Sequence, residues 1–213
     1  MFHIVFDLDW TLVDTQDIHQ NTEAHFFESK WIHIDPKEIW RIYGWRSTVE
    51  WMPEFFSKHN VDISMDEIIH FINSKNDALV KWIKAWKIQL MPWVLETLNT
   101  LHSKAKIWVS TWGCRSFIDA FLDYFNLMDI IEVSTSADEV LRKKPAPDVF
   151  IRSFDKLEKK HGKAVDKYVV WDAESDILWW KGAWAKTVLY LNKYEAPYDY
   201  FIELIEELNL IIK

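Results

Sequence analysis

Five short, mainly apolar runs with several β-branched residues recur along this 213-residue chain, and stretches of helical length separate them. The runs cover residues 2–6, 106–110, 130–134, 168–171 and 187–191. Their nearly continuous hydrophobicity is typical of strands that are buried on both faces of a parallel sheet. The stretches between them predict crossover helices at residues 94–103, 116–125, 148–160 and 175–185. Alternating strands and helices predict an α/β fold with a doubly wound, Rossmann-like parallel sheet.

The distance between the first and the second run is too long for a single crossover helix. Residues from about 15 to 85 are mostly helical in pattern, with helix starts expected at Asp35-Pro36 and Ser64-Met65-Asp66. Met91-Pro92 then marks the return of the chain to the sheet. We therefore expect an α/β core made of residues 1–14 and 86–213, with a helical cap subdomain of residues 15–85 inserted after the first strand.

Polar side chains follow four of the predicted strands at the point where each strand ends. These residues are Asp7 and Asp9, Ser110 and Thr111, Lys144 in the loop after the third strand, and Asp172. In open α/β sheets, ligands bind at the carboxyl ends of the strands. The sequence therefore predicts one site at which these groups converge.

Asp7-Leu8-Asp9 places two carboxylates two residues apart, directly after a strand. If the chain stays extended there, both side chains point the same way. One carboxylate can attack phosphorus and form an aspartyl-phosphate, which divides a difficult hydrolysis into two steps. The other can protonate the leaving oxygen and then activate water. An isolated Asp-x-Asp at a strand end is more often a solvated pair, so the interpretation depends on its partners.

Asp172 adds a third carboxylate at a strand end, and Asp176 lies four residues further on, at the first turn of the next predicted helix. Carboxylate oxygens suit Mg²⁺, which can neutralise phosphate charge and let an anionic nucleophile approach. Helix capping is the alternative, and it explains Ser175 better than Asp172. Lys144, in a loop stiffened by two prolines, can hold a phosphoryl oxygen, and Ser110 can donate a hydrogen bond to one. When each residue is considered alone, the alternative interpretation is an ordinary surface lysine for Lys144 and a turn residue for Ser110.

Together, FDLDWTLVDT, VSTW, KKPAPDVF and VVWDAESDIL resemble the haloacid dehalogenase-like hydrolase superfamily, in its helical-cap phosphatase branch. The resemblance runs over the whole chain. It implies that Asp7 is the nucleophile, that Asp9 is the acid/base residue, and that Ser110 and Lys144 orient the phosphate. It also implies that Asp7, the Asp9 carbonyl and Asp172 bind Mg²⁺. The carboxylate of Asp9 favours phosphate chemistry, since dehalogenases of this superfamily usually lack one there.

Two features of the predicted cap are similar to substrate-contacting parts of the same branch. Thr15 and His19 have the placement of residues near the cap hinge of β-phosphoglucomutase-like members. Gly44-Trp45-Arg46 resembles the cap loop that contacts substrate, where Arg46 can grip a second anionic group. A helix cap for Thr15 and a solvated cation for Arg46 are the alternatives.

The net charge of −8 argues against a nucleic-acid-binding protein, and no stretch approaches the ~20 apolar residues that span a bilayer. The start of the chain has no basic segment followed by a long apolar run, and the single Cys114 cannot form an internal disulfide. We expect a cytoplasmic protein that acts on a small phosphorylated metabolite. The sequence does not indicate the oligomeric state.

The chain contains 14 Trp and only 4 Gly. The family pattern has glycine at Trp10, Trp93 and Trp171, and near Trp112, Trp180 and Trp184. Counted together, the tryptophans and glycines of this chain come close to the share of glycine in an average protein. Glycine in such loops allows a positive φ or a close approach of the backbone to phosphate. One hypothesis is a UGA codon that is read as glycine in the organism and was translated as tryptophan. The alternative is a tryptophan-rich member with a blocked site.

The expected function is Mg²⁺-dependent hydrolysis of a small phosphate monoester through an aspartyl-phosphate. A sugar phosphomutase similar to β-phosphoglucomutase is the alternative enzyme. A catalytically impaired binding relative is the non-enzymatic alternative, and it follows if the tryptophans are real.

Overall fold

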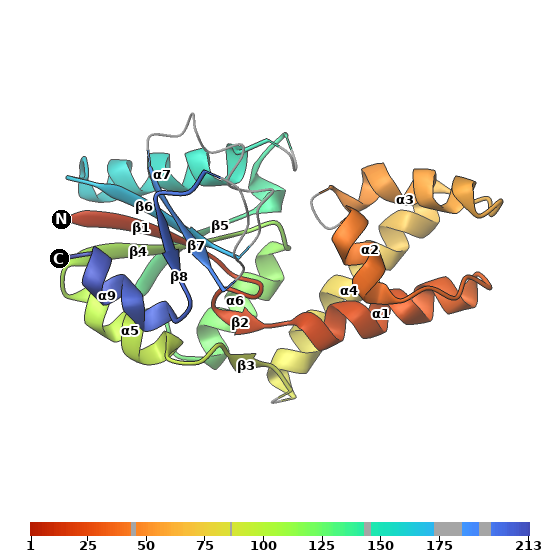
Figure 1. Ribbon diagram of the computed structural model, residues 1–213, viewed down its shortest axis with the longest axis horizontal. Helices are drawn as coiled ribbons and strands as arrows, with labels where there is room; N and C mark the ends of the chain where they lie inside the picture. The colour runs from red at the N-terminus through yellow and green to blue at the C-terminus, as the bar shows by residue number, and fades with distance from the viewer. Residues whose placement is uncertain (44–45, 86, 143–145, 173–184, 192–196) are drawn as a thin grey trace.

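The computed structural model describes residues 1–43, 46–85, 87–142, 146–172, 185–191 and 197–213, apart from the side chains of Pro36 and Trp40. Within these residues, a parallel sheet with helices on both faces forms one part of the molecule. A bundle of four helices forms the other part, beside one end of the sheet (Figure 1).

The six strands of the sheet lie in the order β5-β4-β1-β6-β7-β8, and all neighbouring pairs are parallel. Their bounds are β1 (Phe2–Asp7), β4 (Ala105–Thr111), β5 (Ile131–Ser136), β6 (Lys167–Trp171), β7 (Lys186–Tyr190) and β8 (Tyr200–Ile202). From central β1, the chain builds outward first through β4 and β5 and then through β6 to β8. This doubly wound order confirms the predicted fold class. The edge strand β8 was not predicted, because three residues are too short to stand out as an apolar run.

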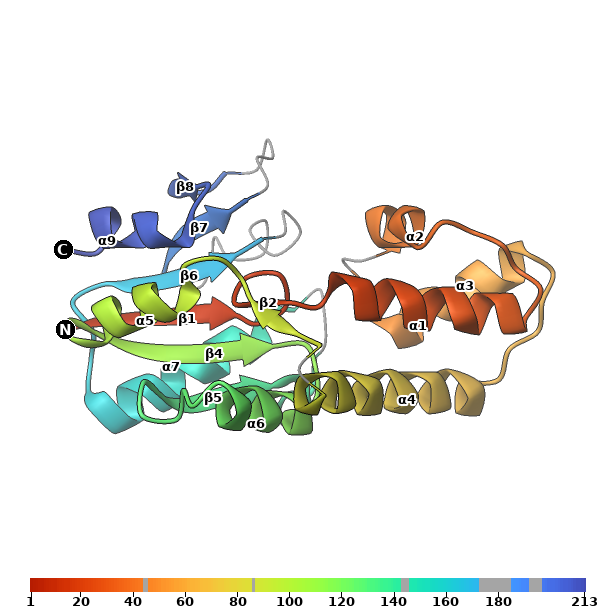
Figure 2. The same cartoon turned by 90° about the horizontal axis from the view of Figure 1, so that it is seen from below.

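Side chains alternate between the two faces of the sheet, as strand geometry requires. Ile4 and Phe6 of β1 belong to one buried cluster, which α5 (Val94–His102), α6 (Arg115–Tyr124) and α9 (Leu208–Ile211) cover. Val5 belongs to the cluster beneath α7 (Asp148–His161) on the other face. Figure 2 shows α7 and α5 on opposite sides of the sheet. The predicted helices at residues 94–103, 116–125 and 148–160 are confirmed, and the one at 175–185 lies almost wholly outside the described residues.

The helical bundle has a hydrophobic core of its own. It comprises α1 (Gln16–Ser29), α2 (Pro36–Tyr43), α3 (Thr48–Lys58) and α4 (Met65–Lys84). Ten buried residues fill its centre, among them Phe27, Trp51, Phe55, Phe56 and Phe71. The expected helix starts are confirmed: α2 begins at Pro36, and Ser64 and Glu67 form a capping box at the start of α4.

The chain passes between sheet and bundle through two short antiparallel strands, β2 (Val13–Asp14) and β3 (Gln89–Leu90). The Met91 N–H donates to the Leu12 carbonyl at 2.9 Å, beside the predicted return to the sheet. The C-terminal part of α4 also packs into the core beside the sheet, because Leu79 and Ile83 belong to the same buried cluster as Ile4 and Phe6 of β1. The subdomain boundaries proposed at residues 14/15 and 85/86 stay a prediction. Among the described helices, none is both long and apolar enough to cross a membrane.

Candidate active site

The carboxyl ends of β1, β4 and β6 bring three of the predicted residues to one edge of the sheet. Asp7 is the last residue of β1 and pairs in register with Ser110 of β4. On the other side of β1, Phe6 pairs with Val170 of β6, so that Asp172 follows the neighbouring strand end. Asp7 and Asp172 are both buried. The edge at which open α/β sheets bind ligands therefore carries two buried carboxylates.

Asp9 accepts hydrogen bonds from three side chains, two at the start of α1 and one at the end of β4. The Thr15 hydroxyl, which precedes α1, donates to Asp9 Oδ1 at 2.7 Å, and His19 Nε2 of α1 lies 3.3 Å from the same oxygen. The Thr111 hydroxyl at the end of β4 donates to Asp9 Oδ2 at 3.2 Å. The Asp9 side chain is a quarter exposed (25%). Asp9 thus joins the sheet to the first helix of the bundle.

These donors determine the charge of Asp9. Burial on its own would raise the pKa of the carboxyl, but the hydrogen bond and charge of His19 and the hydroxyls of Thr15 and Thr111 outweigh it. The pKa of Asp9 therefore lies below its ordinary value, and the group is a carboxylate at neutral pH. A carboxylate of this kind is ready to accept a proton from water.

Ser110 and Thr111 face different neighbours. The fully buried Ser110 hydroxyl donates to the Val149 carbonyl at 3.4 Å and accepts from the Ser153 hydroxyl at 3.3 Å, both on α7. The Thr111 hydroxyl faces Asp9 and also accepts from the Gly113 N–H at 2.9 Å. Thr111, one of the predicted site residues at the strand ends, is therefore the β4 side chain that is joined to Asp9.

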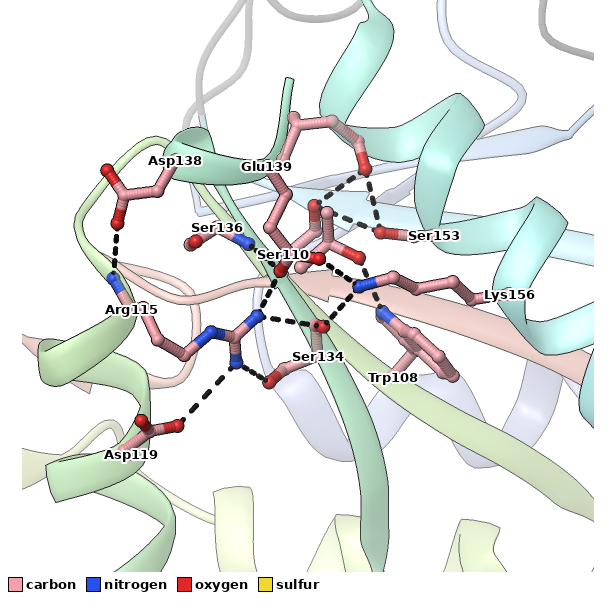
Figure 3. A network of polar contacts seen from close by, with 12 residues as sticks. Trp108, Ser110, Arg115, Asp119, Ser134, Ser136, Asp138, Glu139, Ser153 and Lys156 are labelled. Atoms are coloured by element: carbon pink, nitrogen blue, oxygen red, sulfur yellow. Dashed lines mark hydrogen bonds and ion pairs between the residues drawn. The ribbon is translucent and has the colours of Figure 1, made fainter.

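A polar network that the sequence did not reveal braces the carboxyl end of β5 (Figure 3). Arg115 donates to the Ser134 hydroxyl at 2.6 Å, and Lys156 donates to the Ser134 carbonyl at 3.2 Å. Both cations also pair with Glu139, in the 3₁₀ turn Ala137–Glu139. Burial alone would raise the pKa of Glu139, but Lys156, the Ser136 N–H and Arg115 hold it below the ordinary value.

A second unpredicted feature lies inside the bundle, further along the helix that carries His19. Glu23 of α1 and Lys75 of α4 form an ion pair at 3.3 Å, with 3% and 12% of their side chains exposed. Glu23 follows His19 by four residues and shares its helix face. That spacing is the sequence signal that could have revealed it.

Arg46 contacts α3 of the bundle. Its guanidinium donates to Glu54 of α3 at 2.6 Å and to the Glu50 carbonyl at 3.4 Å. Hydrogen bonds from Lys58 and then Arg46 lower the pKa of Glu54 to about 2. The role of Arg46 in gripping substrate stays a prediction.

Two predicted site residues, Lys144 and Asp176, lie outside the described residues, as do Trp180 and Trp184. The segment that carries Lys144 is flanked by a two-pronged ion pair. Arg142 Nε donates to Asp148 Oδ2 at 2.9 Å, and Arg142 Nη2 donates to Asp148 Oδ1 at 2.7 Å. This pair connects the residues before and after the segment.

The donor chemistry at the sheet edge fits a magnesium ion. Asp7 and Asp172 supply hard oxygens at neighbouring strand ends, and Mg²⁺ in proteins is often held by one or two carboxylates together with water and phosphate. A cation would offset the repulsion between two buried like charges. Across the described ranges, no group of three or more His, Cys, Asp and Glu side chains is placed to hold a metal ion on its own.

Comparisons with known proteins agree with this architecture. Protein CbbY of Rhodobacter capsulatus is 27% identical over 167 residues, which cover 72% of this chain and 70% of that protein. Pyrophosphatase PpaX of Anoxybacillus flavithermus is 28% identical over 191 residues, covering 86% of this chain and 80% of the relative. The crystal structure of CbbY from Rhodobacter sphaeroides in complex with phosphate superposes with a TM-score of 0.80 at 19% identity, covering 97% of this chain and 95% of that one.

The family model for haloacid dehalogenase-like hydrolases matches residues 4–189, which include the carboxyl ends of β1, β4, β5 and β6. The match spans most of the chain and begins in the strand that carries Asp7. The protein therefore belongs to the haloacid dehalogenase-like hydrolase family.

Proposed function

We propose that this hydrolase cleaves a small phosphate monoester in a Mg²⁺-dependent reaction, with Asp7 as the nucleophile. The observation that carries the proposal is the pair of buried carboxylates, Asp7 and Asp172, on neighbouring strand ends beside the hydrogen-bonded Asp9. The names of two relatives support a small phosphorylated substrate. A CbbY was crystallised with phosphate and with xylulose-(1,5)bisphosphate, and PpaX is a pyrophosphatase.

In the first step, an Asp7 carboxylate oxygen attacks phosphorus, and the bond from phosphorus to the leaving oxygen breaks. The leaving oxygen takes a proton from Asp9. Asp9 is ionised in the free protein, so substrate must supply the conditions for its protonation. A phosphoryl dianion beside Asp9 does this, since a nearby like charge raises the pKa of a carboxyl.

In the second step, Asp9 accepts a proton from water, and the water oxygen attacks the phosphorus of the aspartyl-phosphate. The bond between phosphorus and Asp7 breaks, which releases inorganic phosphate and restores the carboxylate. The donors from Thr15, His19 and Thr111 hold Asp9 in place for both steps. A bound Mg²⁺ on Asp7, the Asp9 carbonyl, Asp172 and Asp176 would neutralise phosphoryl charge.

The remaining predicted groups complete the proposed site. Lys144 and Ser110 would orient the phosphoryl oxygens, and Thr111, whose hydroxyl is bound to Asp9, would line the substrate site. The helical bundle would act as a cap that closes over the sheet edge and excludes water, with His19 and Arg46 facing substrate. For Ser110, this role requires its hydroxyl to turn away from Val149 and Ser153.

A phosphatase assay with Mg²⁺ and p-nitrophenyl phosphate tests the proposal. Asp7→Asn should abolish turnover, because the amide is a poor nucleophile. Asp17→Asn removes an exposed carboxylate from the first turn of α1 and should leave turnover unchanged. Equal activity in Asp7→Asn and the unaltered protein would remove Asp7 from the mechanism.

Product analysis with a hexose 1-phosphate separates hydrolysis from phosphoryl return. Release of inorganic phosphate supports the proposed phosphatase, whereas an isomeric hexose phosphate identifies a phosphomutase that uses the same nucleophile. Binding of the sugar phosphate without either product identifies an impaired relative. The hexose 1-phosphate assay is run on the protein with the sequence as given and on its Trp10→Gly variant.

A further inference from the structure

Tryptophan occupies the left-handed region of backbone space in this chain far more often than its chemistry favours. Positive φ occurs at six described residues other than glycine: Trp10, Trp31, Asn60, Trp93, Asn126 and Leu191. The structure describes the backbone of nine of the tryptophans, so three of these nine are left-handed. Only a few per cent of non-glycine residues have positive φ, and among them Asn and Asp are favoured.

Trp31 allows a direct comparison within the chain, because three helices end in the same motif. After α1, the Trp31 N–H donates to the Glu28 carbonyl at 2.9 Å, and the Ile32 N–H donates to the Phe27 carbonyl at 3.0 Å. This pair of bonds is the Schellman motif, whose left-handed position is normally glycine and sometimes asparagine.

The other two helices have asparagine where α1 has tryptophan. After α3, Asn60 donates to Ser57 at 3.1 Å and Val61 to Phe56 at 3.0 Å, and Asn60 has a φ of 56°. After α6, Asn126 has a φ of 53° and makes the equivalent bond to Asp123. Trp31, at 62°, is the one of these three positions with a residue that disfavours the conformation.

Packing does not explain why an indole stands at Trp31 or Trp93. Trp31 is 89% exposed and Trp93 is 53% exposed, so neither side chain gains much by burial. Trp93 directly precedes α5 with a φ of 65°. Trp10 follows the catalytic candidate Asp9, and its N–H donates to the Val13 carbonyl at 2.8 Å in a tight loop.

Other tryptophans show the opposite combination. Trp51, Trp108 and Trp171 are buried and have no positive φ, and Trp108 donates to the Thr135 hydroxyl at 3.1 Å. The backbone therefore distinguishes positions that call for glycine from positions that do not. At Trp171, the glycine expected from the family pattern stays a prediction.

We infer that Trp10, Trp31 and Trp93 are glycine in the protein as its own organism makes it, because a codon assigned here to tryptophan is read there as glycine. A left-handed position is open to glycine without steric penalty, and a single recoded codon accounts for all three sites. Trp31 is included because of its backbone conformation alone. It lies in the bundle rather than at the proposed catalytic edge.

The direct test is the gene together with the mass of the native protein. We expect UGA at codons 10, 31 and 93. We also expect the tryptic peptide covering residues 31–37, from the organism's own protein, to be lighter by the difference between tryptophan and glycine. UGG codons or a peptide of tryptophan mass would overturn the inference. Neither readout uses enzymatic activity, so failure of the proposed function leaves this test intact.

A stability series at position 31 tests the physical reason separately. Trp31→Gly should raise the thermal midpoint by about 2–5 °C, since relief of the left-handed conformation exceeds the greater unfolded-state entropy of glycine. Trp31→Asn should recover part of this gain. Trp31→Ala removes the indole but keeps a Cβ, and should gain less than either. Equal gains in the Gly and Ala variants would show that the indole, not the backbone, is at fault, and would refute the reasoning.

Discussion

The buried ion pair between Glu23 and Lys75 allows a quantitative test of the helical bundle. Lys75→Met keeps the length of the side chain but removes its charge, and leaves the Glu23 carboxylate with only 3% of its side chain exposed. Breaking a buried ion pair from one side costs about 3–5 kcal/mol, because the remaining charge stays desolvated. At about 2–4 °C per kcal/mol for a chain of this size, the thermal midpoint should fall by roughly 6–20 °C.

The chain provides a matched control that joins the same two helices. Lys30, directly after α1, pairs with Glu67 of α4, but both side chains are more exposed, at 24% and 45%. Lys30→Met should therefore destabilise the protein far less than Lys75→Met. The double variant Glu23→Leu/Lys75→Met removes both buried charges and should return to within about 1 kcal/mol of the unaltered protein.

The assay is thermal melting followed by far-ultraviolet circular dichroism, with urea unfolding as a second measurement. If Lys75→Met destabilises no more than Lys30→Met, solvent reaches Glu23 and the burial argument is wrong. If the double variant is as unstable as Lys75→Met, the loss comes from packing rather than from an unpaired charge.

Three further predictions concern protons and the metal. Burial, reinforced by the charge of His161, lowers the pKa of His3, so the unfolded chain binds more protons below about pH 6.5. The free energy of unfolding should fall as the pH drops from about 7 to 5, and His3→Gln should flatten that slope in urea titrations. Thr15→Val removes a donor to Asp9 and should move the limb of the pH–rate profile that Asp9 governs to higher pH, whereas Thr22→Val, which loses only hydrogen bonds within α1, should not. Chelation with EDTA should abolish hydrolysis, and added Mg²⁺ should restore it; unchanged turnover in EDTA would exclude the proposed metal.

The fold could be predicted from the sequence because parallel strands buried on both faces leave an apolar signal. β1 and β4 are almost wholly buried, and their predicted bounds differ from the observed ones by one residue at each end at most. β8 has three residues at the edge of the sheet and only one of them is buried, so its burial leaves no comparable pattern. Strand prediction here succeeded where burial is deepest.

The site could be predicted as far as strand ends determine it. The register that pairs Asp7 with Ser110 follows from the parallel sheet, but the sequence does not say which face of the sheet each of these side chains occupies. Ser110 turns to α7 and Thr111 to Asp9, because adjacent residues of a strand face opposite sides. The Arg115–Glu139–Lys156 network joins segments distant in sequence, and no local pattern indicates it.

Asp9 shows why the helical bundle and the chemistry of the sheet edge cannot be considered separately. Two of its donors, Thr15 and His19, belong to the start of α1, and the third, Thr111, belongs to β4. Only one of the two Asp9 oxygens is therefore bound by the bundle. Burial alone would raise the pKa of Asp9, and the contacts from Thr15 and His19 are part of what holds it below the ordinary value. The bundle therefore contributes to the charge of the group that must both give and accept a proton in the proposed reaction.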